Sequence, residues 1–309
     1  MLDINLFREK PELIKASEKK RGRDTKTVDE VIKLDKQWRD VLQDVEKLKH
    51  KRNIVSEEIN KLKKAGKSAE SKINEMKEVA QEILELEQKA KNLEAARDEL
   101  RYKIGNILHD SVPAGMEAKV VRTWGKIQKY NFPLKSHVDL LADLDVGDLD
   151  RAAKITGARF YFLKNELVLL NLALQKFGMD LLFKKGYVPM YTPFMMNRDA
   201  IKSAAELGDF ASTLYKIEGE DMFLIATAEQ TCAAYYMNEV IDEEKLPIKF
   251  AGFSTNFRKE AGSHGKDMKG IFRVHQFDKV EQYVLCKPED SWTLHEELIK
   301  NAEEFFKAL

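Results

Sequence analysis

The chain has 309 residues, 43% of them hydrophobic, so it can bury a core and is long enough for two domains. Its 52 Lys and Arg residues equal its 52 Asp and Glu residues, which excludes a strongly basic or acidic chain and confines any nucleic-acid contact to a local surface. Cys232 and Cys286 lack the spacing of a metal site, and no run of about 18 apolar residues predicts a membrane span. We therefore expect a cytoplasmic protein with no membrane partner.

A long helical hairpin is the first predicted element, over residues 28–107. Apolar residues recur in steps of three and four over 31–62 and again over 76–107, with Arg52 and Arg97 each filling one position of the series. This is the heptad pattern of a coiled coil. Two matching series joined by a short turn predict an antiparallel hairpin that projects about 50 Å, at 1.5 Å per helical residue.

Positive charge gathers in the outer part of this hairpin. Residues 46–72 include nine Lys or Arg and four Glu, an excess of five, and no aromatic residue. Such a surface suits the phosphate backbone and shape of a nucleic acid better than stacking on its bases. A coiled coil that serves only as a spacer or dimerisation device is the alternative. The basic residues expected to contact RNA are Lys47, Lys49, Lys51, Arg52, Lys61, Lys63, Lys64 and Lys67.

The helical period ends near Pro113, so we expect one domain over residues 1–110 and a second over 111–309. The second part alternates helical and strand-like segments, and two of its strands follow each other closely. Neighbouring antiparallel strands with helices outside them predict an α+β fold. Helices are expected over 167–186, 231–241 and 289–309, and strands over 187–193, 248–260 and 271–285.

The expected hairpin of this domain, residues 257–282, reads FRKEAGSHGKDMKGIFRVHQFDKVEQ. On its second strand Phe277 and Glu281 share one face, about 13 Å apart, while Val274 falls on the other face. Arg258 on the first strand has the planar, permanently charged group that suits a phosphate. An aromatic ring, an arginine and a carboxylate fit an adenine, a phosphate and a small molecule. An ordinary hairpin with a core phenylalanine and a rim ion pair is the alternative.

Two further stretches have open interpretations. In ATAEQ, Thr227 and Glu229 share a face if a strand continues through them, but Thr227 and Gln230 also form the capping-box pattern of a helix that starts near Thr231. The loop GSHGKDMKG is either a solvated turn or a basic cover for phosphates. His264 in this loop and His275 beyond it have no matched partners in the sequence.

Several stretches together resemble the seryl-tRNA synthetases, which are class II aminoacyl-tRNA synthetases. They are MLDINLFRE, the long arm, GYVPMYTP, ATAEQ and the 257–282 hairpin, in this order, and the resemblance covers essentially all 309 residues. GYVPMYTP, which ends at Pro193, resembles motif 1, which in that family belongs to the homodimer interface. The 257–282 hairpin resembles motif 2.

The resemblance implies ATP-dependent ligation of L-serine to tRNA(Ser) through seryl-adenylate, with Mg²⁺, in a homodimer whose arm grips the tRNA. tRNA(Sec) is a candidate further acceptor. Within this implied site, Arg258 clamps the α-phosphate, Phe277 stacks on adenine, and Val274 contacts ATP through its backbone. The implied serine-binding residues are Thr227, Glu229 and Glu281, and the implied ATP-binding residues are Arg258, Glu260, Val274 and Phe277.

The chain departs from the family's pattern after Glu281. The third motif of class II synthetases, a glycine-rich strand and helix with a second arginine, has no counterpart there, and no Mg²⁺ ligands are expected within the chain. We therefore expect a truncated synthetase that alone forms seryl-adenylate weakly or not at all. The alternatives are a shortened paralogue that binds tRNA without catalysis and a ligase that charges a carrier protein, although the long arm argues against the second.

Overall fold

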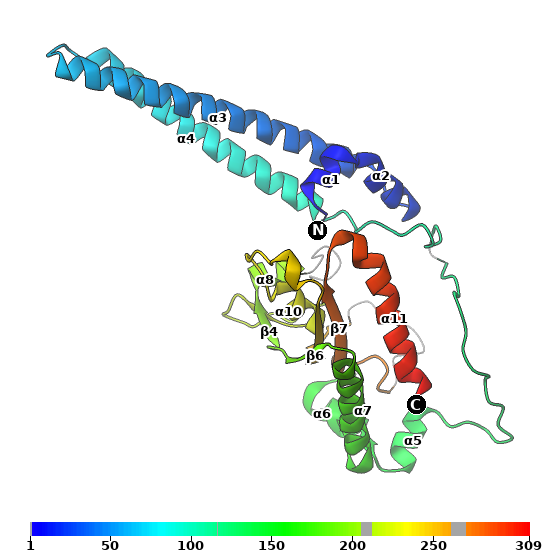
Figure 1. The fold of residues 1–309 in the computed structure, drawn as a ribbon. Helices are drawn as coiled ribbons and strands as arrows, with labels where there is room; N and C mark the ends of the chain where they lie inside the picture. Colours follow the sequence, from blue (N-terminus) through cyan, green and yellow to red (C-terminus); the bar gives the residue numbers. More distant parts are fainter. Residues whose placement is uncertain (1, 116, 205–211, 261–269) are drawn as a thin grey trace. The chain divides into compact units, whose positions relative to one another are not determined.

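The structure, a computed structural model, describes residues 2–115, 117–204, 212–260 and 270–309 (Figure 1). It divides into two compact units, Met1–Gly125 and Lys126–Leu309, and each is described by itself. The expected domain boundary after residue 110 stays a prediction. Among the described helices, none combines the length and apolar character needed to cross a membrane.

The first unit is helical. Two short helices precede two long ones, and the long pair lies side by side as the predicted antiparallel arm (Figure 1). Gly66 makes the turn between them with φ +69°, a left-handed conformation that glycine adopts without strain. The helices are α1 (Ile4–Glu9), α2 (Pro11–Lys20), α3 (Lys26–Lys64) and α4 (Glu70–Arg101).

The arm ends earlier than the expected residue 107. After Arg101 the chain leaves the helix and packs against α2, where the Leu108 backbone N–H donates to the Ser17 hydroxyl at 2.9 Å. Ile104 is buried in the core of this unit beside Phe7 and Ile14. Packing against α2 therefore replaces the end of the helix that the spacing of apolar residues predicted.

The two arginines in the apolar series have different surroundings. Arg52 is half-buried, whereas Arg97 is 4% exposed and its guanidinium lies 4.8 Å from the centre of the Trp38 ring. Arg97 Nη1 is 3.3 Å from a carboxylate oxygen of Asp35, which is 2% exposed. Arg8 binds the same carboxylate through two nitrogens, each at 2.8 Å. A buried ion cluster thus joins α1, α3 and α4.

The second unit is built on a three-stranded sheet in the order β3-β6-β7. β3 (Val188–Tyr191) pairs in parallel with β6 (Ile248–Phe257), and β6 pairs antiparallel with β7 (Gln276–Leu285). The register places Gly252 opposite Glu281 and Asn256 opposite Phe277. The other elements are α5 (His137–Asp143), β1 (Gly147–Asp148), α6 (Leu149–Thr156), β2 (Phe162–Leu163), β4 (Met195–Asn197), α8 (Arg198–Ala204), β5 (Met222–Leu224), η1 (Glu243–Lys245) and η3 (Pro288–Asp290).

Helices cover both faces of this sheet (Figure 1). α7 (Asn165–Lys184) and α11 (Ser291–Lys307) pack on one face, where Leu182, Tyr187 and Ala251 form a buried cluster with Leu298 of α11 at its edge. α10 (Ala228–Ala234) packs on the other face. Because side chains of a strand alternate between faces, residues that share the parity of Glu281 point toward α10. The predicted α+β fold is confirmed.

Three elements of the second unit have boundaries that differ from the predicted ones. The first hairpin strand ends at Phe257 instead of residue 260, and the second begins at Gln276 instead of 271. Glu260 and Gly270 have φ +47° and +94°, conformations that no extended strand contains. The helix expected over 231–241 occupies Ala228–Ala234 instead, because Thr227, four residues before the expected start, is its N-cap.

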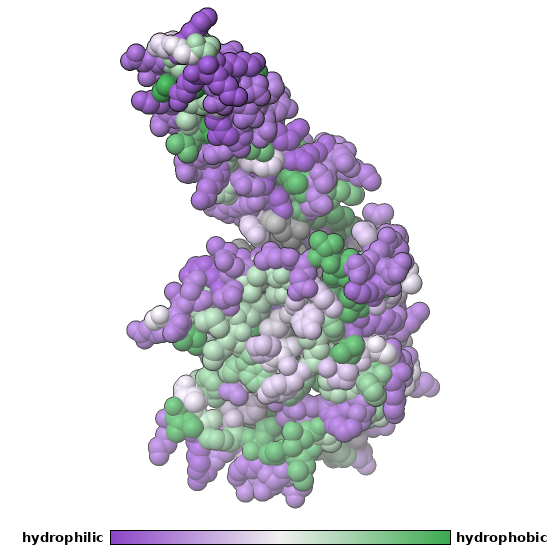
Figure 2. All heavy atoms as spheres, turned by 60° about the vertical axis from the view of Figure 1, so that its left-hand side comes forward, coloured by the Kyte–Doolittle hydropathy of each residue, from purple (hydrophilic) through white to green (hydrophobic). Residues whose placement is uncertain are grey.

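Hydrophilic residues dominate the surface of the arm, whereas the Lys126–Leu309 unit shows several hydrophobic areas (Figure 2). On the arm, the apolar residues of the heptad pattern face the partner helix and are buried or half-buried, so the outer surface is mostly hydrophilic. On the second unit, several apolar side chains of α7 and β3 are exposed, among them Leu169, Val188 and Tyr191.

Candidate active site

The four residues expected to bind ATP lie together. Arg258, Glu260, Val274 and Phe277 all line one depression with a volume of about 500 Å³ at the loop end of the β6–β7 hairpin. Ile271, Phe272 and Arg273 complete its wall. The loop with Lys266 and Lys269, which we considered as a cover for phosphates, lies outside the described residues.

The side chain of Arg258 spans two parts of the site. Its guanidinium is 5.1 Å from the centre of the Phe277 ring, and its Nε donates a hydrogen bond of 3.2 Å to the Ala226 carbonyl. Ala226 directly precedes Thr227. The arginine therefore lies between the aromatic ring of one predicted subsite and the start of the other.

Val274 is 5% exposed and lines the same depression as Phe277. Residues 271–275 are not in the strand, so strand parity does not apply to them, and the backbone contact expected of Val274 stays a prediction. Glu260 also lies beyond the strand, where its carboxylate accepts a hydrogen bond of 2.6 Å from Arg273 Nε. The grouping of these residues was predicted from family resemblance, and strand parity does not account for it.

His275, to which the sequence assigned no role, supports the backbone of Arg258. The Arg258 N–H donates to the His275 carbonyl at 2.9 Å, and His275 Nδ1 donates to the Arg258 carbonyl at 2.8 Å. A carbonyl can only accept, so this contact places the proton on Nδ1. The Phe160 ring stacks on the imidazole with 5.2 Å between ring centres. The signal in the sequence was its place opposite Arg258 across the hairpin.

The expected serine ligands form a second cluster beside the first. The Thr227 hydroxyl donates a short hydrogen bond to Glu281 Oε2. The backbone N–H of Glu229 is 3.2 Å from the Thr227 hydroxyl oxygen and 3.3 Å from Glu281 Oε2. Thr227 is the N-cap of α10 as the capping interpretation of ATAEQ expected, but its hydroxyl accepts from the Glu229 N–H, and Gln230 Oε1 accepts from the Ala226 N–H instead of completing a capping box. The cap also brings Thr227 and Glu229 to Glu281, which is 52 or more residues away.

Burial and the charges of Glu229 and Glu281 shift pKa values within this cluster. Burial, and next the charge of Glu281, raise the pKa of Glu229, although solvent still reaches the Glu229 side chain. Burial also raises the pKa of the Cys232 thiol to about 11, with further contributions from both glutamates. The pKa of the Tyr283 hydroxyl is raised by burial, Glu229 and Cys232 in that order. The cluster thus carries more negative charge than its environment favours.

Lys279 is the cationic member of this cluster, and its role was not predicted. Its ammonium lies 2.7 Å from the Thr227 hydroxyl oxygen and 2.5 Å from Glu281 Oε2. The parity of β7 had placed Lys279 on the same face as Glu281, which was the available signal. The contact with Thr227 bridges 52 residues of chain and could not be read from either stretch alone.

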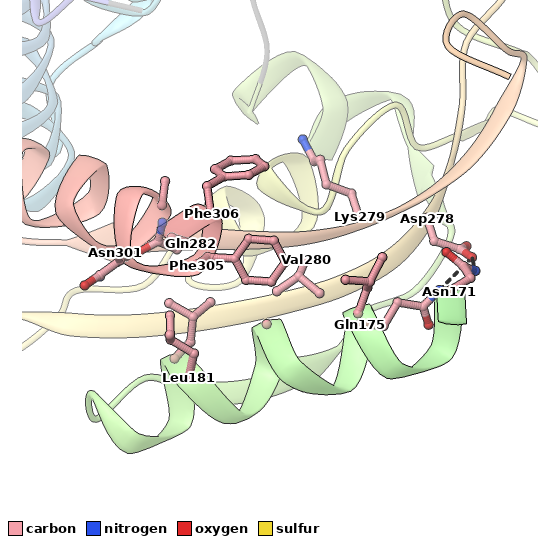
Figure 3. Close-up of a pocket in the computed structure, with 14 residues that line it drawn as sticks. Asn171, Gln175, Leu181, Asp278, Lys279, Val280, Gln282, Asn301, Phe305 and Phe306 are labelled. Carbon is pink, nitrogen blue, oxygen red and sulfur yellow. Dashed lines mark hydrogen bonds between the residues drawn. The ribbon is translucent and has the colours of Figure 1, made fainter. Parts of the chain in front are cut away.

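A second cavity lies on the opposite face of the sheet. This cavity of about 460 Å³ is bounded by α7, β7 and α11, with Val280 and Asp278 of β7 turned toward α7 (Figure 3). Gln175 Nε2 donates to Asp278 at 3.1 Å at one end. It contains none of the predicted ligand-binding residues and is separated from them by the thickness of the sheet.

The lysines expected to contact RNA fall into two sets, those that form ion pairs within the arm and those that do not. Lys49 and Lys51 on α3 pair with Glu87 and Glu75 on α4 at 3.0 and 3.1 Å, so they also tie the two helices together. Lys47 pairs with Asp44 at 2.9 Å. Within the described part of the chain, no acidic group lies within ion-pair distance of the four exposed lysines at the tip, Lys61, Lys63, Lys64 and Lys67.

Among the described residues, no group of three or more His, Cys, Asp or Glu side chains could hold a metal ion. The site therefore has no dedicated cation cage formed by the residues that the structure describes. Its charged groups are two arginines, a lysine and three glutamates divided between the two clusters.

Comparison with known protein families agrees with this architecture. Residues 1–108 match the seryl-tRNA synthetase N-terminal domain, and residues 213–309 match the tRNA synthetase class II core domain (G, H, P, S and T). An arm of this kind attached to such a core defines a class II aminoacyl-tRNA synthetase.

Individual relatives cover the whole chain. The serine--tRNA ligase of Methanosphaera stadtmanae is 48% identical over 312 residues, which is 100% of this chain and 73% of that protein. The crystal structure of seryl-tRNA synthetase from Pyrococcus horikoshii complexed with ATP has a TM-score of 0.89 and 42% identity, covering 99% of this chain and 74% of that one. The cytoplasmic enzyme of Naegleria fowleri in complex with AMP gives 0.84 and 36%, covering 100% and 76%. The chain belongs to the seryl-tRNA synthetase family.

Proposed function

We propose that this chain binds ATP and L-serine, joins them as seryl-adenylate, and transfers the seryl group to tRNA(Ser). The observation that carries this proposal is the meeting of two adjoining clusters on one face of the β6–β7 hairpin, bridged by Arg258. One cluster has the aromatic ring and arginine that suit a nucleotide, and the other has the carboxylates that suit an amino acid. The related Pyrococcus horikoshii enzyme was crystallised with ATP, which supports the first assignment.

In the nucleotide subsite, Phe277 stacks on adenine, while Glu260 and Val274 line the depression around it. Arg258 donates hydrogen bonds to the α-phosphate, because a guanidinium stays charged and presents parallel donors to phosphate oxygens. Its place between Phe277 and Ala226 puts the phosphate next to Thr227. The order of adenine, phosphate and amino acid along this face follows.

In the amino-acid subsite, Glu229 and Glu281 bind the ammonium and hydroxyl of serine, together with Thr227. A partly buried carboxylate that accepts from a substrate hydroxyl rejects analogues without it, since its own polar atoms would lose a partner. Alanine, which differs from serine only by this hydroxyl, is the analogue that such a pocket excludes.

Two bond-forming steps follow. A carboxylate oxygen of serine attacks the α-phosphorus, and the bond from that phosphorus to the bridging oxygen of the β-phosphate breaks, releasing pyrophosphate. A terminal ribose hydroxyl of tRNA then attacks the seryl carbonyl, AMP leaves, and the hydroxyl proton passes to solvent. The protein contributes alignment of the reacting groups and the positive charge of Arg258.

Mg²⁺ is part of the proposal as a partner of ATP. Magnesium is usually held by substrate phosphates with one or two carboxylates and not by a complete protein cage. The described residues provide no such cage, so Mg²⁺ would arrive with the nucleotide, and we assign no step to it.

We further propose that the arm binds the tRNA body, in a homodimer located in the cytoplasm, with tRNA(Sec) as a candidate second acceptor. The exposed lysines at the tip support an RNA contact. Tyr191 of β3 is 75% exposed and Val188 53%, and both belong to the stretch that resembles motif 1. Light scattering should give a dimer mass that Tyr191→Glu lowers to that of a monomer.

Serine-dependent ATP–pyrophosphate exchange tests the first step. It should be measured on the 309-residue chain and on the same chain with any further sequence that its gene encodes. Exchange that requires serine, and that alanine does not support, would establish the proposed activity. Absence of exchange from both, with tRNA binding retained, would favour the non-catalytic tRNA-binding paralogue instead.

A further inference from the structure

The ammonium of Lys279 lies inside the amino-acid subsite. It is within hydrogen-bond distance of the Thr227 hydroxyl oxygen and Glu281 Oε2, at 2.7 and 2.5 Å. Its side chain points away from α7, on the opposite side of β7 from Val280 (Figure 3). The residue also lines the cavity between α7, β7 and α11, but its ammonium contacts the proposed site.

The charges in this subsite balance only when Lys279 is counted. Glu229 and Glu281 bring two negative charges to the region where a substrate with one ammonium group would bind. Two neighbouring carboxylates repel each other, and one of them then tends to take up a proton. Lys279 cancels the charge of Glu281, so a single negative charge remains to match the single ammonium of serine.

We propose that Lys279 is a positioning residue that neutralises the charge of Glu281 and holds it toward Thr227, so that the carboxylate of Glu229 is left to bind the ammonium of serine. This inference rests on the proposed function of the site. It assigns each glutamate a distinct cationic partner, Lys279 for Glu281 and the ammonium of serine for Glu229. Without the lysine, the two carboxylates compete for one substrate cation.

Other charged and titratable groups surround the Lys279–Glu281 pair. Arg258 lies at the nucleotide end, where its Nε donates to the Ala226 carbonyl, so it is committed to the phosphate side. The charges of Lys279 and Arg258 both lower the pKa of Glu229, but burial and the charge of Glu281 raise it by more. Cys232 of α10 and Tyr283 of β7 are uncharged near neutral pH, since burial raises the pKa of each. Lys279 is thus the cation in direct contact with the carboxylate cluster.

The test compares Lys279→Met with Lys279→Arg across pH, using L-serine and ATP as separate probes. Binding of serine should weaken in Lys279→Met, and it should weaken further as the pH is lowered from about 8 to about 6, because the variant loses a positive charge that lowers the pKa of Glu229. Lys279→Arg should keep most of the wild-type affinity and pH profile. Affinity for ATP should stay at the wild-type value in both variants.

Each outcome has a distinct meaning. If wild-type protein binds no serine, the proposed function falls and the inference with it. If wild type binds serine and Lys279→Met has the same affinity and pH profile, the inference is wrong while the function stands. A parallel loss of serine and ATP binding, with a lower melting temperature in both variants, would show a structural role only. Lys279→Gln, which keeps a hydrogen-bond donor without the charge, separates the two roles if Lys279→Met does not fold.

Discussion

The Arg258 guanidinium covers one face of the Phe277 ring, 5.1 Å from its centre. The residue proposed to bind the α-phosphate and the residue proposed to stack on adenine therefore touch each other. Because Arg258 Nε also donates to the Ala226 carbonyl, contacts with both clusters hold its side chain in place. A change in Phe277 should affect nucleotide binding without reaching the amino-acid cluster.

Phe277→Leu should raise the Kd for ATP about tenfold, since stacking of a base on an aromatic ring contributes roughly 1 to 3 kcal/mol. Calorimetric titration with ATP measures this. Phe277→Tyr, which keeps the ring, is the control and should bind ATP as wild type does. Equal ATP affinity in the leucine variant would show that the ring is no adenine platform.

Glu229→Gln should make the protein more stable and less able to bind serine. Burial and the charge of Glu281 raise the pKa of Glu229 above its ordinary value of 4.5, so the folded protein holds this proton more tightly than the unfolded chain does. The ionised carboxylate therefore lowers stability at neutral pH, and the free energy of unfolding rises as the pH falls through the folded pKa. Glu229→Gln has no carboxylate to ionise, so it does not suffer this loss of stability.

Thermal denaturation at a series of pH values checks this prediction. The melting temperature of Glu229→Gln should exceed that of wild type at neutral pH, and the difference should shrink on acidification. The exposed Glu239→Gln serves as the control and should change neither the melting temperature nor serine binding. A lower melting temperature for Glu229→Gln at neutral pH would contradict the expected cost of ionisation.

The lysines at the arm tip should dominate the salt dependence of tRNA binding. Removing a phosphate contact lowers the slope of log K against log salt by about 0.7 to 0.9. Filter binding at several salt concentrations would show weaker affinity and a flatter slope for the tip variant, with ATP–pyrophosphate exchange unchanged. The tip variant carries Lys61→Gln, Lys63→Gln, Lys64→Gln and Lys67→Gln.

A second variant with the same change in charge provides the control for the arm. Its four exposed lysines lie near the base of the hairpin and should affect binding much less. Equal losses in the two variants would mean that net charge, and not contact at the tip, controls RNA binding. The control variant carries Lys33→Gln, Lys36→Gln, Lys89→Gln and Lys91→Gln.

Asp35→Ala should lower the free energy of unfolding by about 3 kcal/mol, because it leaves the buried Arg97 without its cross-helix partner. Burial alone would raise the pKa of Asp35, but the hydrogen bonds and charges of Arg8 and Arg39 outweigh it and lower that pKa below 3.8. The cluster therefore stabilises the fold above this range, and its contribution is lost as the pH falls through the folded pKa.

Denaturant unfolding followed by circular dichroism measures the loss. The matched control is Asp44→Ala, which removes an exposed carboxylate paired with Lys47 on the same helix and should cost less than about 0.5 kcal/mol. Similar losses for the two variants would indicate that the buried cluster contributes no more than a surface pair.

Gly252→Ala should weaken serine binding more than ATP binding. A Cβ at this position would lie 3.0 Å from Ala228 Cβ and 3.1 Å from Cys232 Sγ, so α10 would have to move away from β6. That shift carries Thr227 away from Glu281, which is opposite Gly252 on β7. A displacement of a few tenths of an ångström at such a site costs up to about tenfold in KM for serine.

Steady-state exchange kinetics with each substrate varied in turn tests the packing of Gly252. The same substitution at Gly178 is the control, since a Cβ there would meet Phe305 and Val280 at ordinary distances of 3.6 and 3.7 Å. Cys232→Ala combined with Gly252→Ala should restore part of the lost serine affinity. No recovery, or an equal rise in KM for ATP, would contradict the proposed spacing.

Much of the architecture could be predicted because it depends on local period. The heptad steps determine which side of each arm helix is apolar, and alternation along β7 places Phe277, Lys279 and Glu281 on one face whatever surrounds the strand. The grouping of Arg258, Glu260, Val274 and Phe277 came from motif resemblance, since no periodic rule relates Val274 to Phe277 across the end of a strand.

Tertiary structure decided the contacts that join distant stretches and the points at which strands stop. Lys279 meets Thr227 only because the α10 cap packs against β7, and Arg97 meets Asp35 only because two long helices align in register. The strand ends depend on backbone conformations of single residues, such as the positive φ of Glu260. Sequence periodicity determines which face a side chain occupies, whereas partners across a fold depend on packing and charge compensation that no single stretch contains.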